Sequence, residues 1–134
     1  MKIAIVGTTT WGTILGWMLS SRGIEATLWA RTEEEAARLN QDRENRRLLP
    51  GVTFPQGLSA TASINEAMEG AEIVIFAVPS QSMRANVRRV REALREPSLI
   101  LSATKGLEAE TTRRMSQILE EELEPRLHNR ICVL

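Results

Sequence analysis

The fold of this 134-residue chain is decided by its first strand and turn, Lys2-Ile3-Ala4-Ile5-Val6-Gly7-Thr8-Thr9-Thr10-Trp11-Gly12. Residues 3–6 are all apolar, which is typical of a strand inside a sheet that is covered on both faces. Residues 11–19 then carry apolar side chains at helical spacing. A buried strand, a turn with glycines and a helix together form the first unit of a parallel α/β sheet.

The same alternation continues along the chain. Potential capping boxes, Thr32 with Glu35 and Ser63 with Glu66, indicate two further helix starts. The order of segments predicts a doubly wound, mostly parallel α/β sheet with helices on both faces and right-handed crossovers. The other predicted strands are residues 26–30, 72–78, 98–102 and 131–134, and the later predicted helices are 83–94 and 115–123.

Two stretches depart from this rhythm. Residues 40–60 contain two prolines and two glycines without a clear period, so we expect a long loop that leads into a short strand near residues 58–61. The apolar run 131–134 has no turn or cap after it. We therefore expect a single domain, residues 1–134, cut from a longer protein after its sixth strand; the alternative is a short edge strand at a true C-terminus.

Composition excludes several classes of protein. Lys plus Arg and Asp plus Glu are 17 each, and Tyr is absent, so electrostatic capture of nucleic acid is not expected. No apolar run reaches the roughly 18 residues needed to span a bilayer, and the single cysteine, Cys132, fits a reducing compartment and is expected to be buried. His128 has no partner at metal-ligand spacing, so no metal site is expected. These features predict a cytoplasmic protein without membrane insertion.

The first turn resembles a dinucleotide fingerprint, G-x-G-x-x-G, in which Gly7 and Gly12 supply the tight turn and the close packing of helix on strand. Thr9 stands where the middle glycine normally lets the pyrophosphate approach. Its stiff, β-branched side chain is expected to obstruct that approach. Alternatively, the hydroxyls of Thr8, Thr9 and Thr10 could donate to phosphate oxygens. A further alternative is that this segment is a generic α/β turn that binds no ligand.

The second predicted strand ends in Arg31, where a site that prefers NAD places an acidic residue. A guanidinium matches the oxygens of a 2′-phosphate, so NADP(H) is the favoured cofactor. The alternative is a solvated arginine that pairs with Glu34 or Glu35.

Two further strand ends lie at the carboxyl edge, where open α/β sheets bind ligands. One carries Pro79 and Ser80, and the other carries Lys105. Lys105 belongs to no basic cluster and could hold a phosphate or polarise a carbonyl; the alternative is an ordinary loop lysine. The arginines at 84, 88, 89, 91 and 95 are interpreted as one solvated helix face, balanced by the glutamates at 120–122 and 124.

Five motifs in the right order make the chain similar to the N-terminal, nucleotide-binding half of bacterial NAD(P)-dependent glycerol-3-phosphate dehydrogenases, which have a Rossmann fold. Many Rossmann proteins share the first motif, whereas the last is quite specific. Thr9, where the family has glycine, and Leu48, where an aromatic residue is common, are departures. The motifs are KIAIVG with WGT (2–7 and 11–13), LWAR (28–31), RENRRLLPG (43–51), FAVPSQ (76–81) and SATKGLEAET (102–111).

The resemblance implies roles for particular residues. It implies that Thr10, Trp11 and Arg31 contact the nicotinamide cofactor, with a weaker contact from the loop at Arg47–Leu48. It implies that Lys105 reaches both the cofactor and glycerol 3-phosphate. The candidate cofactor-binding set is therefore Gly7, Thr9, Thr10, Trp11, Gly12, Arg31, Leu48, Pro79, Ser80 and Lys105, with Lys105 also as the substrate-binding residue.

The family continues with a Ser-Gly-Pro stretch and a helical domain that carries the catalytic lysine. No catalytic residue is therefore expected within residues 1–134, and this fragment alone is expected to be inactive. The full-length protein would transfer a hydride between NAD(P)H and dihydroxyacetone phosphate, giving sn-glycerol 3-phosphate for phospholipid synthesis, and could form a homodimer. The competing hypothesis is a non-catalytic nucleotide-sensing or interaction module on the same scaffold.

Overall fold

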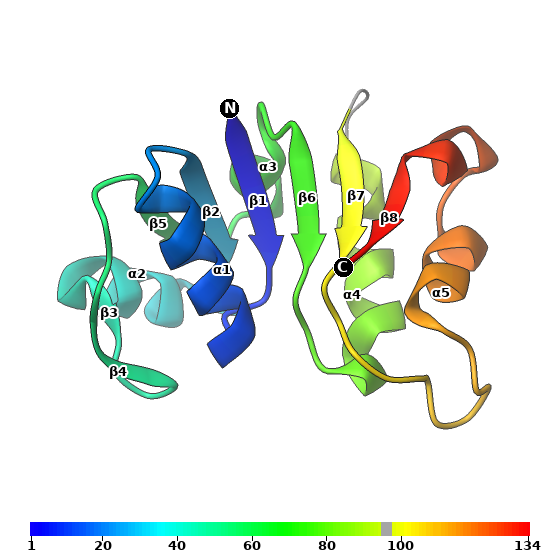
Figure 1. Cartoon of the computed structure of the whole chain (residues 1–134), viewed down its shortest axis with the longest axis horizontal. Helices are drawn as coiled ribbons and strands as arrows, with labels where there is room; N and C mark the ends of the chain where they lie inside the picture. The colour runs from blue at the N-terminus through cyan, green and yellow to red at the C-terminus, as the bar shows by residue number, and fades with distance from the viewer. Residues whose placement is uncertain (95–97) are drawn as a thin grey trace.

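A computed structural model describes residues 1–94 and 98–134 and contains one six-stranded sheet (Figure 1). The strand order is β5-β2-β1-β6-β7-β8, and every pairing within it is parallel. This arrangement confirms the predicted doubly wound sheet. Its strands are β1 (Lys2–Val6), β2 (Glu25–Trp29), β5 (Leu58–Thr61), β6 (Ile73–Phe76), β7 (Leu99–Ser102) and β8 (Ile131–Val133).

The centre of the sheet is the point where the strand order reverses. From β1 the chain builds outward through β2 to β5, then returns to β6 beside β1 and builds outward in the other direction. Connections leave the carboxyl ends of β1 and β6 toward opposite sides. Such a switch point opens a crevice at the carboxyl edge of the sheet, which is where ligands bind in open α/β folds.

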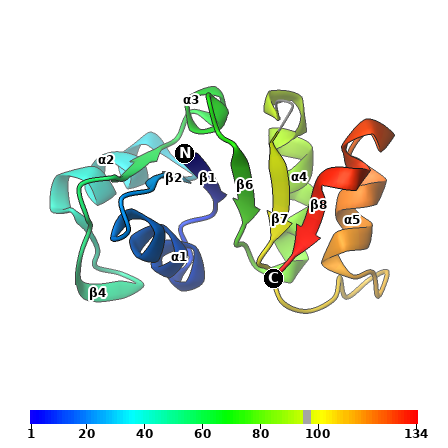
Figure 2. The same cartoon turned by 45° about the horizontal axis from the view of Figure 1, so that its top comes forward.

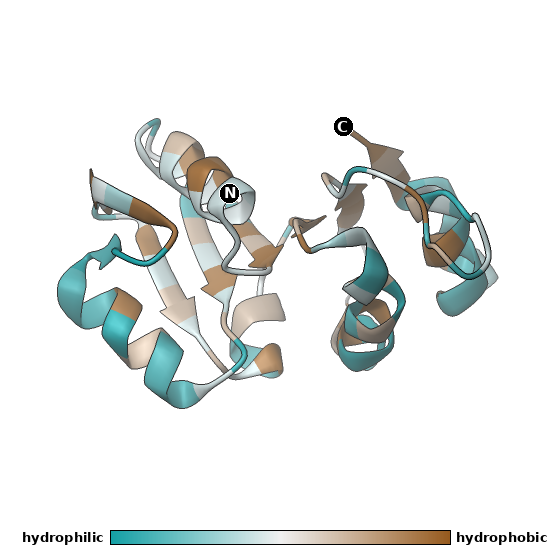
Figure 3. Cartoon of the chain, turned by 90° about the horizontal axis from the view of Figure 1, so that it is seen from below, coloured by the Kyte–Doolittle hydropathy of each residue, from teal (hydrophilic) through white to brown (hydrophobic). Residues whose placement is uncertain are grey.

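Helices cover both faces of the sheet, as the doubly buried strands require. In β1, Ile3 and Ile5 face the core packed by α1 and α2, whereas Ala4 and Val6 face the core packed by α3, α4 and α5. Apolar residues are concentrated in the strands, and much of the helix surface is hydrophilic (Figure 3). The α-helices are α1 (Thr10–Ser20), α2 (Glu33–Asp42), α3 (Ile64–Met68), α4 (Met83–Val90) and α5 (Met115–Glu122); the 3₁₀ turns are η1 (Ser80–Ser82), η2 (Arg91–Ala93) and η3 (Pro125–Arg130).

Half of each predicted capping box is present. The Thr32 hydroxyl accepts from the Glu35 amide at 3.1 Å, and the Ser63 hydroxyl accepts from the Glu66 amide at 3.3 Å. The two carboxylates have other donors: Glu35 accepts from the amide of Arg31, and Glu66 accepts from the hydroxyl of the strand residue Thr61. These contacts tie each helix start to the strand before it.

The prediction of an irregular loop over residues 40–60 is wrong in its middle. β3 (Glu44–Asn45) and β4 (Leu49–Thr53) pair antiparallel as a hairpin beside α1, seen in Figures 1 and 2. Arg43 stabilises the segment that leads from the hairpin back to the sheet, because its guanidinium donates to the carbonyls of Phe54, Pro55 and Leu58. Short, half-exposed strands leave no apolar period in the sequence, which explains the error. The strand expected near residues 58–61 is confirmed as β5.

Three smaller expectations concern Cys132, Arg95 and a membrane segment. Cys132 is exposed rather than buried, because it lies on β8 at the edge of the sheet. Arg95 lies outside the described residues. Within residues 1–94 and 98–134, no helix is long and apolar enough to cross a membrane.

Candidate functional site

The three consecutive threonines after β1 each donate a hydrogen bond to a different part of the protein. These contacts fix the loop between β1 and α1, and they direct the three hydroxyl protons at protein acceptors. The alternative in which these hydroxyls donate to phosphate oxygens would require them to exchange these protein acceptors for the ligand. For Thr8, Thr9 and Thr10 the acceptors are the Glu35 carboxylate on α2, the Ala77 carbonyl after β6 and the Leu48 carbonyl in the hairpin, at 2.6, 2.7 and 3.2 Å.

Thr9 has a second structural role as the N-cap of α1. Its hydroxyl accepts from the Gly12 amide at 3.0 Å, and its backbone carbonyl accepts from the Thr13 amide at 2.9 Å. The amides of Thr10 and Trp11, in the first turn, have no acceptor within the helix. Those two amides, with the positive end of the helix dipole, are the groups that this loop offers to an anion.

Gly7 and Gly12 have the roles that the fingerprint assigns to them. Gly7 has φ +118°, and a Cβ atom there would lie 2.6 Å from the Ala77 carbonyl oxygen. A Cβ atom on Gly12 would lie 2.6 Å from the Gly7 carbonyl oxygen. Both positions therefore require glycine: Gly7 because the loop passes against the residue that follows β6, and Gly12 because α1 begins against the loop.

A cavity of about 830 Å³ opens at the carboxyl edge, at the switch point between β1 and β6. Of the predicted site residues, it is lined by Gly7, Thr9, Arg31, Leu48 and Pro79. The structure thus brings together residues from four separate segments of the chain. The remaining predicted residues, Thr10, Trp11, Gly12, Ser80 and Lys105, are not in its lining.

The acidic side chains around this cavity have partners, whereas several of its arginines have no ion-pair partner among the described residues. Its acidic residues are engaged: Asp42 and Glu44 lie 3.5 and 3.8 Å from Arg46, and Glu35 accepts from Thr8 and from the Arg31 amide. The alternative in which the Arg31 side chain pairs with Glu34 or Glu35 is not observed. Among the described residues, no ion-pair partner contacts the guanidiniums of three arginines in the lining, Arg31, Arg38 and Arg47.

Sequence reasoning missed Arg38 and Asn86, which also line the cavity. Arg38 follows Glu35 by three residues on α2, so helical spacing from the capping glutamate could have found it. Asn86 is buried on α4 and donates its amide to the Ser82 carbonyl at 2.8 Å. No pattern in the sequence distinguishes that asparagine from its neighbours.

Lys105 lies on the other side of the fingerprint loop from Arg31. Its ammonium is 6.0 Å from the centroid of the Trp11 ring, so the structure does bring these two predicted residues together. The ring face attracts a cation at this distance. Lys105 has no ion-pair partner among the residues that the structure describes, and its charge is therefore available to a ligand.

The fold and the cavity define a class. A parallel sheet in this strand order, with a glycine-dependent turn after β1 and a basic cavity at the switch point, is a Rossmann domain of the dinucleotide-binding type. The family described as "NAD-dependent glycerol-3-phosphate dehydrogenase N-terminus" matches residues 2–134, and the chain belongs to that family.

Individual relatives agree with this assignment. The chain is 48% identical over 134 residues to glycerol-3-phosphate dehydrogenase [NAD(P)+] of Dehalococcoides mccartyi, covering 99% of this chain and 37% of the relative. It is 40% identical over 136 residues to the enzyme of the same name from Corynebacterium glutamicum, covering 100% of this chain and 40% of the relative. The chain thus spans about two-fifths of the length of these curated relatives.

Solved structures give the same picture. Glycerol-3-phosphate dehydrogenase from Coxiella burnetii superposes with a TM-score of 0.86 at 25% identity, over 98% of this chain and 39% of that one. Octopine dehydrogenase in complex with NADH and agmatine superposes with a TM-score of 0.71 at 16% identity, over 98% of this chain and 33% of that one, which shows the shared fold alone.

Proposed function

We propose that this chain is the dinucleotide-binding domain of an enzyme that transfers a hydride between NAD(P)H and dihydroxyacetone phosphate, giving sn-glycerol 3-phosphate. The observation that carries the proposal is the cavity at the switch point, because glycine-dependent turn, helix start and unpaired arginines converge there. The relatives that bear this activity in their names match almost the whole chain.

The residues present fit a dinucleotide. Gly7 and Thr9 line the cavity just before the start of α1, so the pyrophosphate could lie beside this loop and accept from the amides of Thr10 and Trp11. Arg31 lies two residues after the end of β2 at Trp29, where the adenosine ribose of a dinucleotide lies in this fold. When bound, the nicotinamide supplies the hydride chemistry, and the protein supplies binding and orientation.

The unpaired arginines favour NADP(H) over NAD(H). A ribose 2′-phosphate is a dianion, and Arg31, Arg38 and Arg47 line the same cavity without ion-pair partners in the described chain. A guanidinium binds phosphate oxygens in a bidentate way, whereas the ribose hydroxyl of NAD(H) prefers a carboxylate. Leu48 and Pro79 are proposed to contact the cofactor from opposite sides of the cavity.

Lys105 is proposed to reach both the cofactor and the phosphate of the three-carbon substrate. Its ammonium lies beside Trp11 at the start of α1, and it has no ion-pair partner among the described residues. A protonated amine in that place can hold a phosphate or polarise a carbonyl. The catalytic lysine of the family belongs to a helical domain outside residues 1–134, so we expect this chain to bind the cofactor without turnover.

Calorimetric titration of NADPH and NADH at fixed salt tests the cofactor assignment. We expect NADPH to bind about tenfold more tightly, since a charge-assisted phosphate contact contributes roughly 1.5–3 kcal/mol. Arg31→Ala should remove most of the difference, and Arg22→Ala, outside the cavity lining, should leave it unchanged. Equal affinities in the unmutated chain would contradict the preference for NADPH, and absence of any binding would contradict the proposed function.

The proposal extends to a cytoplasmic location and to a homodimer of the full-length protein. The single cysteine, exposed and unpaired, supports a reducing compartment. Light scattering on the full-length protein tests the dimer, and its result bears on neither the fold nor the cofactor.

A further inference from the structure

Lys105 has a backbone that is held on both sides and a side-chain charge that is unpaired in the described chain. Before it, the buried Thr104 hydroxyl donates to the Phe76 carbonyl at 3.1 Å and accepts from the Val78 amide at 3.2 Å. After it, Gly106 has φ +100°, and a Cβ there would lie 3.4 Å from the Ser80 hydroxyl oxygen. The segment therefore turns closely against the start of η1.

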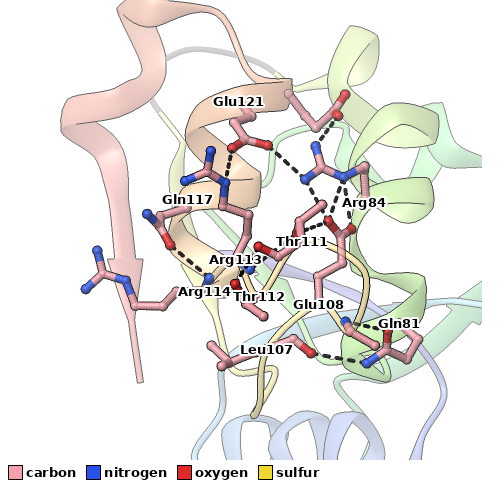
Figure 4. Close-up of polar contacts among 12 residues, drawn as sticks. Gln81, Arg84, Leu107, Glu108, Thr111, Thr112, Arg113, Arg114, Gln117 and Glu121 are labelled. Atoms are coloured by element: carbon pink, nitrogen blue, oxygen red, sulfur yellow. Dashed lines mark hydrogen bonds and ion pairs between the residues drawn. The ribbon is translucent and has the colours of Figure 1, made fainter.

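The side-chain amide of Gln81 forms hydrogen bonds with the backbone of the residues that follow Gly106, as Figure 4 shows for Leu107. The amide nitrogen donates to the Leu107 carbonyl at 3.1 Å, and the amide oxygen accepts from the Ala109 amide at 3.0 Å. These two bonds lie on either side of Glu108. A side chain that satisfies one carbonyl and one amide of an irregular segment acts as a substitute for a neighbouring strand.

Arg84 holds the residue between those two bonds. Its guanidinium binds the Glu108 carboxylate in a bidentate way, with Nε to Oε2 and Nη2 to Oε1 both at 2.9 Å (Figure 4). Thr111 donates its hydroxyl to the same carboxylate. Glu108 is 9% exposed, which is unusual for a carboxylate in an irregular segment.

We infer that Gln81 and Arg84 are positioning residues that fix the place of the Lys105 ammonium beside Trp11. The segment 105–109 belongs to no helix or named strand; its backbone is joined to residues 113 and 114 by an isolated bridge, and these two side chains tie it to η1 and α4. An ammonium on a long, flexible stem is effective only when its backbone is fixed in advance. This inference rests on the proposed role of Lys105, and its first test needs no cofactor.

The chain has two lysines, Lys2 and Lys105, so reductive ¹³C-methylation gives two side-chain NMR signals that can be assigned by mutation. We expect the Lys105 signal to be displaced by the Trp11 ring, and Trp11→Leu to remove that displacement. Gln81→Leu should move the Lys105 signal toward its position in Trp11→Leu. The Lys2 signal is the internal control, because its ammonium donates to the Glu69 carbonyl at 2.7 Å, away from Gln81.

Arg88→Met is the matched control for Gln81→Leu. Arg88 donates to Glu122 in the same group of charges and has no hydrogen bond to residues 105–109. We expect it to leave the Lys105 signal in place. A Lys105 signal that Gln81→Leu leaves unmoved, or that Arg88→Met moves equally, overturns the inference whatever the chain binds.

A double-mutant cycle on NADPH affinity then asks whether Gln81 acts through Lys105. We expect about tenfold weaker binding for Lys105→Ala and about threefold for Gln81→Leu. The double variant should bind no more weakly than Lys105→Ala alone. Full additivity overturns the inference, because Gln81 would then act without Lys105. If Lys105→Ala binds NADPH normally, the proposed cofactor contact fails, and the NMR measurement still decides the positioning.

Discussion

The two halves of the carboxyl edge hold their loops by different means. Around the fingerprint loop, the contacts are threonine hydroxyls donating to neighbouring elements and glycines pressed against backbone, and three cavity arginines have no ion-pair partner among the described residues. Beside α4 and α5, the contacts are ion pairs. Arg84 alone binds Glu108, Glu121 and Glu122, at 2.9, 2.8 and 2.6 Å.

This difference separates arginines that stabilise the fold from arginines that are available to a ligand. Glu122 is 8% exposed and receives both Arg84 and Arg88, so those cations are committed to internal partners. The hydrogen bonds that Arg84 donates to Glu108, Glu122 and Glu121 raise the pKa of its guanidinium above the ordinary value. In the other half the acids are engaged by Arg46, Thr8 and a backbone amide, so the Arg31 guanidinium has no ion-pair partner within residues 1–94 and 98–134 and can bind an anion.

The largest effect on stability is expected from Gly7→Ala, which disrupts the close packing of the loop between β1 and α1. The new Cβ would lie 2.6 Å from the Ala77 carbonyl oxygen, in a backbone with φ +118°. Strain and overpacking together should lower the free energy of unfolding by about 3 kcal/mol, measured by urea denaturation. Gly23→Ala is the control, because Gly23 also has positive φ, +80°, but nothing lies within 4 Å of its Cβ. It should lose only about 1 kcal/mol; equal losses would show that the close approach contributes nothing.

Arg84→Met removes the ion pairs that join α4 to α5 and to Glu108. The Arg84 side chain is 20% exposed, and its removal leaves Glu108 and Glu122 with fewer donors in a poorly hydrated place. We expect a loss of about 2 kcal/mol in the free energy of unfolding. Arg31→Met should change it by less than about 0.5 kcal/mol, since that side chain is exposed and unpaired in the described chain. Similar losses for both arginines would contradict the separation of roles.

Acid should weaken the α4–α5 half selectively. The hydrogen bond from Arg84, followed by that from Thr111, lowers the pKa of Glu108 from 4.5 to about 2, and that from Arg88 lowers the pKa of Glu122. The unfolded chain therefore takes up protons at higher pH than the folded chain does. The stabilisation is complete above about pH 4.5 and is lost as the pH falls toward 2. Urea midpoints measured between neutral pH and pH 3 should fall less steeply in Arg84→Met; identical slopes would contradict this account.

Sequence reasoning located the sheet well because its signals are local. Five of the six strands of this sheet lie in short runs that are mostly apolar, whereas β5, with the sequence LSAT, does not, and β1 has the predicted bounds, Lys2–Val6. The β3–β4 hairpin was missed because its stability comes from Arg43, whose three carbonyl acceptors are distant in sequence and cannot be inferred from periodicity.

The candidate site divides in the same way. Gly7 and Arg31 could be predicted as site residues because each lies just after a predicted strand. Other contacts join segments that only the folded chain brings together. These are the hydrogen bonds of the three threonine hydroxyls and those of the Gln81 side chain to residues 107 and 109. The arginine-rich face of α4 was expected to be solvated and balanced by the glutamates of α5. The balance is present, but it is built from direct ion pairs and includes Glu108, which no pattern in the sequence distinguishes from the other glutamates.

The smallest effect is expected at Thr9, where the fold and the ligand make opposite demands. The hydroxyl caps α1 and donates to the Ala77 carbonyl, so Thr9→Gly should cost about 1 kcal/mol in the free energy of unfolding. Thr9→Ser keeps the hydroxyl and removes only the methyl group, so its stability should stay within about 0.5 kcal/mol of the unmutated chain. If the methyl obstructs the pyrophosphate, as we expect, Thr9→Ser should tighten NADPH binding about twofold, or roughly 0.5 kcal/mol by calorimetry. Thr9→Gly should gain less, because a looser loop and a lost cap offset the extra space. Unchanged affinity in Thr9→Ser would mean that the methyl is not in the way, and that this departure from the glycine fingerprint serves the helix start alone.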